Sequence, residues 1–301
     1  MFKEGLGETS EFAGYHPWVN VTYYILAVGV TMFSLSPWFL AGTFLLSWVY
    51  SVLIRGRKII RLNLIFTFWS LILMAVINVF FTHDGVTVFF YINDNAITLE
   101  ALLFGFSSAV MLVSLIIWFT SFNTIVSADK LIFLFGKAAP VLGLTLTMIF
   151  RYIPLLKNRY EDVRLGQACL NAGEPAGFPE KMRQLGKEIS ILVSWSLESS
   201  IESADSMEAR GYGLPGRTSF HLYRFTMRDG VLLAVMLLLG AVVVTGTVMG
   251  KTKTEFYPAY VPAAMDAAAV VILACYLLLL ALPVIIDIRG ELKWKRSALT
   301  M

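Results

Sequence analysis

Residues 229–250, DGVLLAVMLLLGAVVVTGTVMG, decide the class of fold of this chain. Apart from Asp229 the run carries no charge, and its length matches the ~20 apolar residues that a helix needs to cross the hydrocarbon core of a bilayer. Similar apolar runs lie at about 19–35, 37–54, 64–82, 99–120 and 262–288. The sequence therefore predicts an all-α membrane protein with about six transmembrane helices.

The composition agrees with a membrane protein and offers no catalytic machinery. The chain of 301 residues is 57% apolar and only 15% charged, whereas a soluble domain is nearer a quarter charged. Its three histidines form no HExxH motif, its two cysteines are far apart, and no serine lies in a GxSxG motif. Residues 246–252 read GTVMGKT, which is one residue short of a phosphate-binding loop. We therefore expect a non-catalytic chain that itself binds no cofactor or metal.

The distribution of basic residues predicts the orientation in the membrane. With an even number of crossings, both ends of the chain lie on the same side. The short segments on that side hold 9 Lys and Arg, and those on the opposite side hold only 2. Because basic residues accumulate in cytoplasmic loops, we expect both termini in the cytoplasm and the chain in the plasma membrane of a prokaryote. The acidic N-terminus predicts no signal peptide.

Residues 127–228 form a polar middle region between two transmembrane regions, 1–126 and 229–301. Capping and breaker residues predict three helices in it, at about 128–137, 140–172 and 180–212. Pro154 removes a backbone hydrogen bond where the second helix changes from apolar to charged, so we expect a kink there. This region is the part of the chain that can form a cytoplasmic or interfacial module.

Small side chains recur along the predicted third helix, most of them serines between Ser190 and Ser206. Ser196, Ser199 and Ser203 follow one another at three- and four-residue spacing, which places them on one helix face. Such a face lets another helix approach closely and slide. A face that is simply solvated is the alternative.

The run SMEARGYG at residues 206–213 ends this third helix. It places Arg210 beside the negative end of the helix dipole, and the glycines that follow supply a left-handed cap. The alternative is a helix end without a functional role, in which the arginine is simply solvated.

The same region carries a family resemblance. Its motifs are SADKL at 127–131, TMIFRYIPLL at 147–156, RLGQ at 164–167, SADSMEARGYG at 203–213 and GRT at 216–218. The chain resembles the transmembrane (T) component of energy-coupling factor transporters, the ABC-type importers of vitamins and transition-metal ions. The specific likeness covers about 127–218, and the apolar runs extend it to most of the chain.

The resemblance implies a non-catalytic coupling subunit with several partners. These are two cytoplasmic ABC ATPase subunits that use ATP, one substrate-binding membrane (S) subunit, and the lipid bilayer, with no nucleic acid. It implies that two coupling helices each end in Ala-Arg-Gly and dock on one ATPase. Ala209, Arg210 and Gly211 match the second motif, and Ser196, Ser199 and Ser203 become the expected contact face for the S subunit.

The first coupling motif departs from the family pattern. Where the family has Ala-Arg-Gly, this chain has Asn171, Ala172 and Gly173, without an arginine. We expect a weaker, uncharged contact there, which suits a divergent member that works with a heterodimeric ATPase pair.

A self-sufficient secondary transporter or an intramembrane enzyme is the alternative function. Charged residues inside crossings usually mark ion or proton pathways, and here they are scarce. Asp266 and Asp287 flank the last predicted crossing, and we expect them at the membrane interfaces rather than in a proton relay.

Overall fold

The structure is a computed structural model that describes residues 10–56, 58–82, 85–92, 95–138, 140–170, 177–214, 223–252, 254–262 and 266–299. These residues form nine helices and one two-stranded hairpin. The elements are α1 (Pro17–Phe33), α2 (Pro37–Arg55), α3 (Lys58–Phe81), β1 (Val88–Ile92), β2 (Asn95–Thr98), α4 (Leu99–Ile125), α5 (Ala128–Ala138), α6 (Pro140–Leu170), α7 (Phe178–Ala209), α8 (Met227–Val248) and α9 (Ala267–Leu299). The prediction of an all-α membrane protein is confirmed, with the short antiparallel hairpin as an addition.

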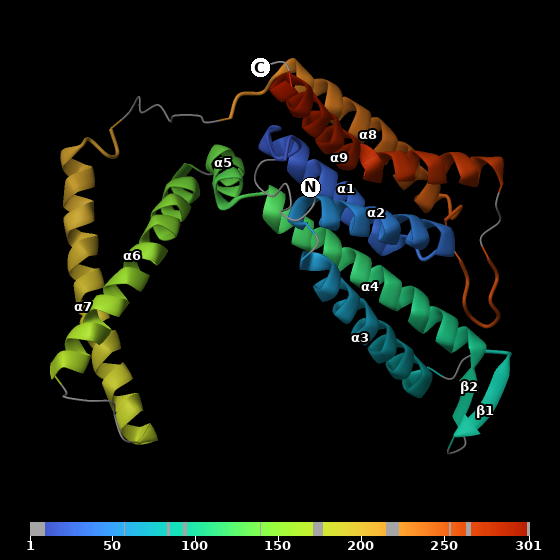
Figure 1. Cartoon of the computed structure of the whole chain (residues 1–301), viewed down its shortest axis with the longest axis horizontal. Coiled ribbons are helices and arrows are strands. Elements are labelled where there is room, and N and C mark those ends of the chain that lie inside the picture. The colour runs from blue at the N-terminus through green and yellow to red at the C-terminus, as the bar shows by residue number, and fades with distance from the viewer. Residues whose placement is uncertain are drawn as a thin grey trace. The chain divides into compact units, whose positions relative to one another are not determined.

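The chain folds into two compact units (Figure 1). Unit 1 joins residues 1–127 to residues 223–301 and holds α1–α4, the hairpin, α8 and α9. Unit 2 is residues 128–222 and holds α5, α6 and α7. Unit 2 is therefore inserted into the chain between the two parts of unit 1, within the polar region at 127–228.

Five helices of the described residues, all in unit 1, are long and apolar enough to cross a bilayer. They are α2, α3, α4, α8 and α9. Helix α1, which corresponds to the predicted crossing at 19–35, is also apolar but has 17 residues. The predicted crossings therefore correspond to the helices of unit 1, with α1 shorter than the other five.

Prolines and a threonine determine where several of these helices begin. Pro17 and Pro37 lie in the first turns of α1 and α2, where the missing N–H has no intrahelical partner to lose. Only Ser34–Ser36 separate α1 from α2, which agrees with the expected short hairpin. At the start of α4 the Thr98 hydroxyl accepts a hydrogen bond from the N–H of Ala101 at 3.3 Å.

Aromatic side chains fill the centre of unit 1. Trp118 of α4 is fully buried and meets Tyr23 of α1 edge to face, with ring centroids 5.8 Å apart. The indole N–H of Trp118 donates to Thr43 of α2 at 3.1 Å. The hydroxyl of Tyr276 of α9 bonds to that of Thr31 of α1 at 2.9 Å. The polar atoms of these aromatics thus find partners across helices and join α1, α2, α4 and α9.

Two glycines let α8 approach its neighbours closely. A Cβ at Gly240 would lie 2.9 Å from the Leu26 side chain of α1. A Cβ at Gly246 would lie 2.5 Å from the Ile272 side chain of α9. The close packing of α8 on α1 and α9 therefore depends on the missing side chains.

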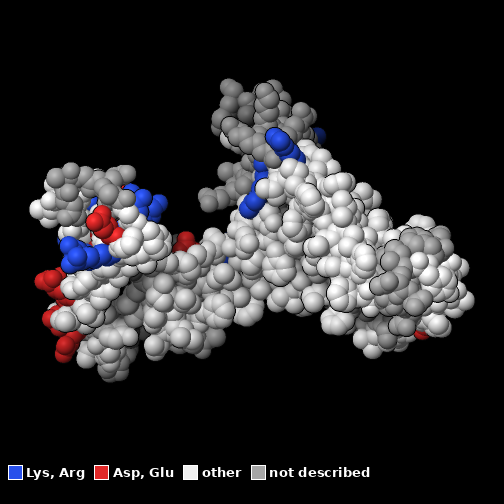
Figure 2. Space-filling model, turned by 90° about the horizontal axis from the view of Figure 1, so that it is seen from below, with Lys and Arg blue, Asp and Glu red and all other residues white. Residues whose placement is uncertain are grey.

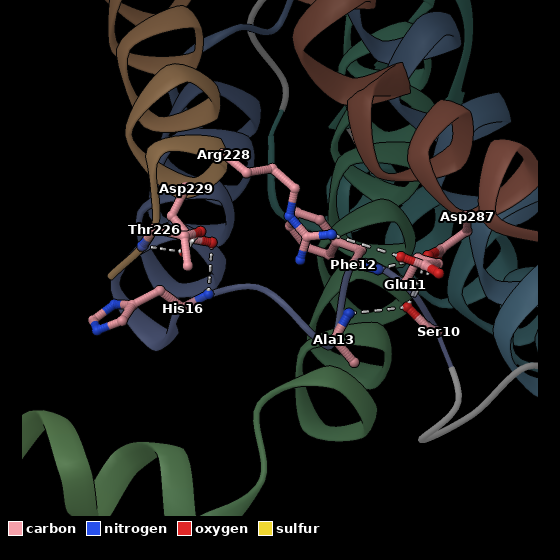
Figure 3. A network of polar contacts seen from close by, with 9 residues as sticks. All are labelled: Ser10, Glu11, Phe12, Ala13, His16, Thr226, Arg228, Asp229 and Asp287. Atoms are coloured by element: carbon pink, nitrogen blue, oxygen red, sulfur yellow. Dashed lines mark hydrogen bonds and ion pairs between the residues drawn. The ribbon is translucent and has the colours of Figure 1, made fainter. Parts of the chain in front are cut away.

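Two aspartates of the last two helices hold the segment that precedes α1 (Figure 3). Asp287 of α9 accepts hydrogen bonds from the Ser10 hydroxyl at 2.9 Å and from the N–H of Phe12 at 2.8 Å. Asp229 of α8 accepts a bond from the N–H of His16 at 3.2 Å. Residues 10–16 are thereby fixed against the start of α8 and the second half of α9. We call residues 10–16 the N-terminal segment.

The two aspartates of the last predicted crossing have different surroundings. Asp266 is exposed and pairs with Lys251 at 2.7 Å, and the hydrogen bond from Lys251 lowers the pKa of Asp266. Asp287 is only 1% exposed and lies inside α9. Asp266 is therefore on the surface of unit 1, whereas the carboxylate of Asp287 is turned inward by its bonds to the N-terminal segment. The expected position of both aspartates at the membrane interfaces stays a prediction.

Candidate functional site

The candidate site lies in unit 2, where α6 crosses α7 (Figure 1). The rings of Tyr152 and Trp195 stack with centroids 6.2 Å apart. The Tyr152 hydroxyl donates to the carbonyl oxygen of Ser196 at 3.4 Å, and a hydrogen bond with Ser199 lowers the pKa of Tyr152. The guanidinium of Arg159 lies 5.1 Å from the centroid of the Trp195 ring. An aromatic pair and a cation therefore join the two long helices.

Helices α5 and α6 are joined by a close glycine contact. A Cβ at Gly143 of α6 would lie 2.5 Å from the Cα of Gly136 of α5, which is well inside van der Waals contact. The two backbones therefore pack directly on one another. This contact fixes the first half of α6, and α6 then continues as one helix through Pro154.

Charged side chains gather on unit 2, as Figure 2 shows for one face. Arg159 and Asp162 form an exposed pair at 3.9 Å along α6. On α7, Gln184 donates to Glu188 at 3.1 Å, and Glu188 is buried. Most other polar side chains of α6 and α7 are exposed. The visible described face of unit 1, in contrast, has few charged side chains, which are a basic group and a small acidic group at its edges.

Arg210 occupies the cap of α7 in a well-defined geometry. The N–H of Gly211 donates to the carbonyl of Glu208 at 2.9 Å, and the N–H of Tyr212 donates to that of Met207 at 3.0 Å. Gly211 has a φ of 77°, the left-handed conformation that glycine adopts without strain. These two bonds form a Schellman cap, so the predicted glycine cap is present. The helix itself ends at Ala209, three residues before the predicted Tyr212.

The cap leaves Arg210 on the surface of unit 2. Ala209 and Arg210 are exposed, and Gly211 is partly exposed. In the part of the chain that the structure describes, no ion pair includes Arg210. A fixed backbone with an exposed guanidinium can form charge-assisted, bidentate bonds to a carboxylate of another protein.

Three serines of α7 donate their hydroxyls to backbone carbonyls of the same helix. Ser194 donates to the carbonyl of Ser190 at 3.0 Å, Ser200 to that of Ser196 at 2.6 Å, and Ser203 to that of Ser199 at 2.7 Å. Because these hydroxyl donors already have backbone acceptors, the small side chains need no acceptor from another molecule. The surface is therefore compatible with a second helix packed against it.

The three serines predicted to share a contact face differ in their surroundings. Ser196 and Ser199 are half-buried, and both bond to Tyr152 at the crossing. Ser203 is exposed. The structure thus brings Ser196 and Ser199 to α6 and leaves Ser203, toward the Arg210 end, open for a partner.

The residues of the first coupling motif fall outside the described part of the chain. Helix α6 ends at Leu170, and Asn171, Ala172 and Gly173 are not among the described residues. Sequence reasoning also does not identify Tyr152 and Trp195 as partners. Tyr152 lies in the quoted motif TMIFRYIPLL and Trp195 lies within the serine run, but neither pattern shows that the two rings meet.

Comparisons with known proteins cover this site. Residues 16–222 match the family described as CbiQ, cobalt transport protein. A relative from Bacillus selenitireducens, strain ATCC 700615, is the energy-coupling factor transporter transmembrane protein EcfT, which is 32% identical over 111 residues. That match spans 36% of this chain and 41% of the relative's length.

Proposed function

Because the chain belongs to the CbiQ cobalt transport protein family, the T components of energy-coupling factor transporters, we propose that it is the transmembrane coupling subunit of an ABC-type importer. In this proposal two ATPase subunits bind unit 2, and their ATP-driven movement is transmitted to a substrate-binding membrane subunit. The cargo class is a vitamin or a transition-metal ion. The chain itself binds no nucleotide and catalyses no reaction.

The observation that carries this proposal is the exposed Arg210 on a fixed helix end. Its Schellman cap sets the direction of the end of α7. In the described residues its guanidinium has no intramolecular ion pair. Ala209, Arg210 and Gly211 would enter a groove on one ATPase and pair with carboxylates there. Movement of the ATPases would then pull on a rigid helix rather than on a flexible loop.

The α6–α7 crossing supports the transmission step of the proposal. Because Tyr152, Trp195 and Arg159 join the helices, a displacement at the Arg210 end is passed to α6. The S subunit would pack against the part of α7 that has small side chains and includes the exposed Ser203. The basic residues at one end of the spans favour a location in the plasma membrane of a prokaryote, with both termini and unit 2 in the cytoplasm.

The first experiment replaces Arg210 by alanine in the complete transporter. We expect the variant to insert in the membrane and to lose ATP-driven uptake, because an unpaired partner carboxylate costs on the order of 2–5 kcal/mol at an interface. Uptake of labelled substrate into vesicles and copurification of the ATPases measure the two effects. Arg183→Ala is the matched control, since Arg183 is also exposed on α7 but lies ~40 Å from Arg210 along the helix.

Two results would count against the proposal. Normal ATP-driven uptake by Arg210→Ala would remove Arg210 as the coupling residue. Uptake by the chain alone in liposomes, driven by an ion gradient without ATPases, would establish the alternative of a secondary transporter.

A further inference from the structure

A groove between α8 and α9 of unit 1 is apolar along its walls. It has a volume of 510 Å³. Helix α8 contributes Val231, Leu232 and Val235, and helix α9 contributes Leu282, Ile285 and Ile286. Exposure is 66% for Val231 and 41% for Ile285, so the groove is open on its outer side. Because α8 and α9 are long and apolar enough to span a bilayer, lipid can reach that open side.

Each apolar wall ends in an arginine. On α8 the wall residues follow Arg228 by three, four and seven positions, and on α9 they precede Arg289 by the same intervals, so each arginine lies on the same helix face as its wall. Lys251, just after α8, pairs with Asp266, just before α9, so the two helices run in opposite directions. The start of α8 and the late part of α9 therefore lie at one end of the groove, and Arg228 and Arg289 line it together.

The two arginines are available to an anion. In the described part of the chain Arg289 is exposed and belongs to no ion pair. Arg228 lies over the Tyr15 ring at 4.2 Å, and its carboxylate partner is Glu11 at 3.9 Å, with both side chains about half exposed. Such a long, exposed pair contributes little energy and competes weakly with another anion.

The neighbouring aspartates do not cancel this charge inside the groove. Figure 3 shows Asp229 turned toward His16 and Thr226, and Asp287 turned toward Ser10 and Phe12. Neither aspartate lines the groove, whose charged lining residues are Arg228 and Arg289.

We propose that this groove binds an anionic phospholipid of the surrounding leaflet, with its phosphate between Arg228 and Arg289 and an acyl chain along the apolar walls. Guanidinium groups match phosphate oxygens in bidentate geometry. The walls extend ~10 Å from Arg228 to Val235, which suits the upper part of an acyl chain. A free inorganic phosphate would use the arginines but not the walls. The cationic group in the headgroup of a zwitterionic lipid would be repelled by the two arginines.

Native mass spectrometry of the full chain in mild detergent tests this proposal, with phosphatidylglycerol as the added lipid. We expect saturable binding that Arg289→Gln weakens about fivefold, and that Arg228→Gln with Arg289→Gln weakens more than about tenfold. Val231→Trp should abolish binding by filling the groove without a change of charge. Arg61→Gln is the charge-matched control, since Arg61 is exposed on α3, which packs on α2 and α4. Its affinity for the lipid should equal that of the unchanged chain.

Several outcomes would overturn the proposal. Equal binding of phosphatidylcholine, which has the same phosphate but no net charge, would show that the groove does not select an anionic lipid. An equal loss in Arg61→Gln would show unspecific attraction to basic residues. Displacement of the lipid by millimolar inorganic phosphate would indicate a free anion site, and a protein retained on the groove instead of lipid would indicate a subunit interface. If Arg228→Gln fails to fold because its contact with Tyr15 is lost, Arg289→Gln and Val231→Trp still decide between these outcomes.

Discussion

Asp287 shows how one buried carboxylate can fix a segment that is remote in sequence. Its oxygens accept bonds from the Ser10 hydroxyl and the Phe12 N–H. Asp287→Ala removes both acceptor sites, and each buried polar group that loses its partner costs about 1–3 kcal/mol. We therefore expect a lower unfolding temperature and faster proteolysis of the N-terminal segment. Thermal unfolding in detergent and limited proteolysis measure these effects.

Asp266→Ala is the control for this prediction. Asp266 is exposed and pairs with Lys251 outside the spans, so its removal should leave the unfolding temperature almost unchanged. If both variants unfold at the same temperature as the unchanged chain, Asp287 does not hold the N-terminal segment.

The close contact of α5 and α6 depends on the absence of a side chain at Gly143. Gly143→Ala would place a methyl group 2.5 Å from the Cα of Gly136, so the two helices must separate. Overpacking of this kind typically costs about 1–3 kcal/mol. We expect weaker thermal stability and loss of ATPase copurification if α6 is displaced.

Gly166→Ala lies in the same helix and has open space at the added methyl group. It should stabilise α6 slightly, since alanine is favoured over glycine by up to about 1 kcal/mol inside a helix. Equal destabilisation by both substitutions would mean that the helix, rather than the contact with Gly136, is sensitive to change.

The serine face of α7 (Ser196, Ser199 and Ser203) has a part in contact with α6 and an exposed part. Tryptophan substitutions can distinguish the roles of these two parts. Ser199 bonds to Tyr152, so Ser199→Trp should disturb the α6–α7 crossing itself. Ser203 is exposed, so Ser203→Trp should leave the crossing intact and block only a helix packed from outside. We expect Ser203→Trp to retain the ATPases and lose the S subunit in copurification. Retention of the S subunit with loss of the ATPases would assign this face to the ATPases instead.

The sequence predicts those features that depend on local composition. A backbone in hydrocarbon must satisfy its own hydrogen bonds, so each apolar run near twenty residues becomes a helix. The cap at Gly211 is also local, because only a few residues define it. The bonds of Asp287 to Ser10 span 277 positions, and the Tyr152–Trp195 stack joins two helices. Neither contact leaves a periodic pattern, so sequence reasoning cannot find them.

The two coupling ends of the chain are predicted to contribute unequally to transport. Arg210 offers a guanidinium, whereas Asn171 offers a neutral amide. A neutral hydrogen bond contributes about 0.5–1.5 kcal/mol, which is less than a buried charged contact at an interface. Asn171→Ala should therefore reduce ATP-driven uptake far less than Arg210→Ala, and raised salt should weaken the contact at Arg210 more. Equal losses of uptake would show that the first end matters as much as the second.

The N-terminal segment also sets an order of events during synthesis. Asp287, the partner of Ser10, is synthesised 277 positions after it, and Asp229, the partner of His16, is synthesised 213 positions after that residue. At typical elongation rates of 5–20 residues per second, Ser10 waits roughly 14–55 s before its acceptor exists. The segment can therefore be fixed only after Asp287 of α9 has been synthesised. The N-terminal segment can form these bonds only when both α8 and α9 have been made and have folded against it. In chains truncated before α9, this segment would stay accessible to quality-control proteases.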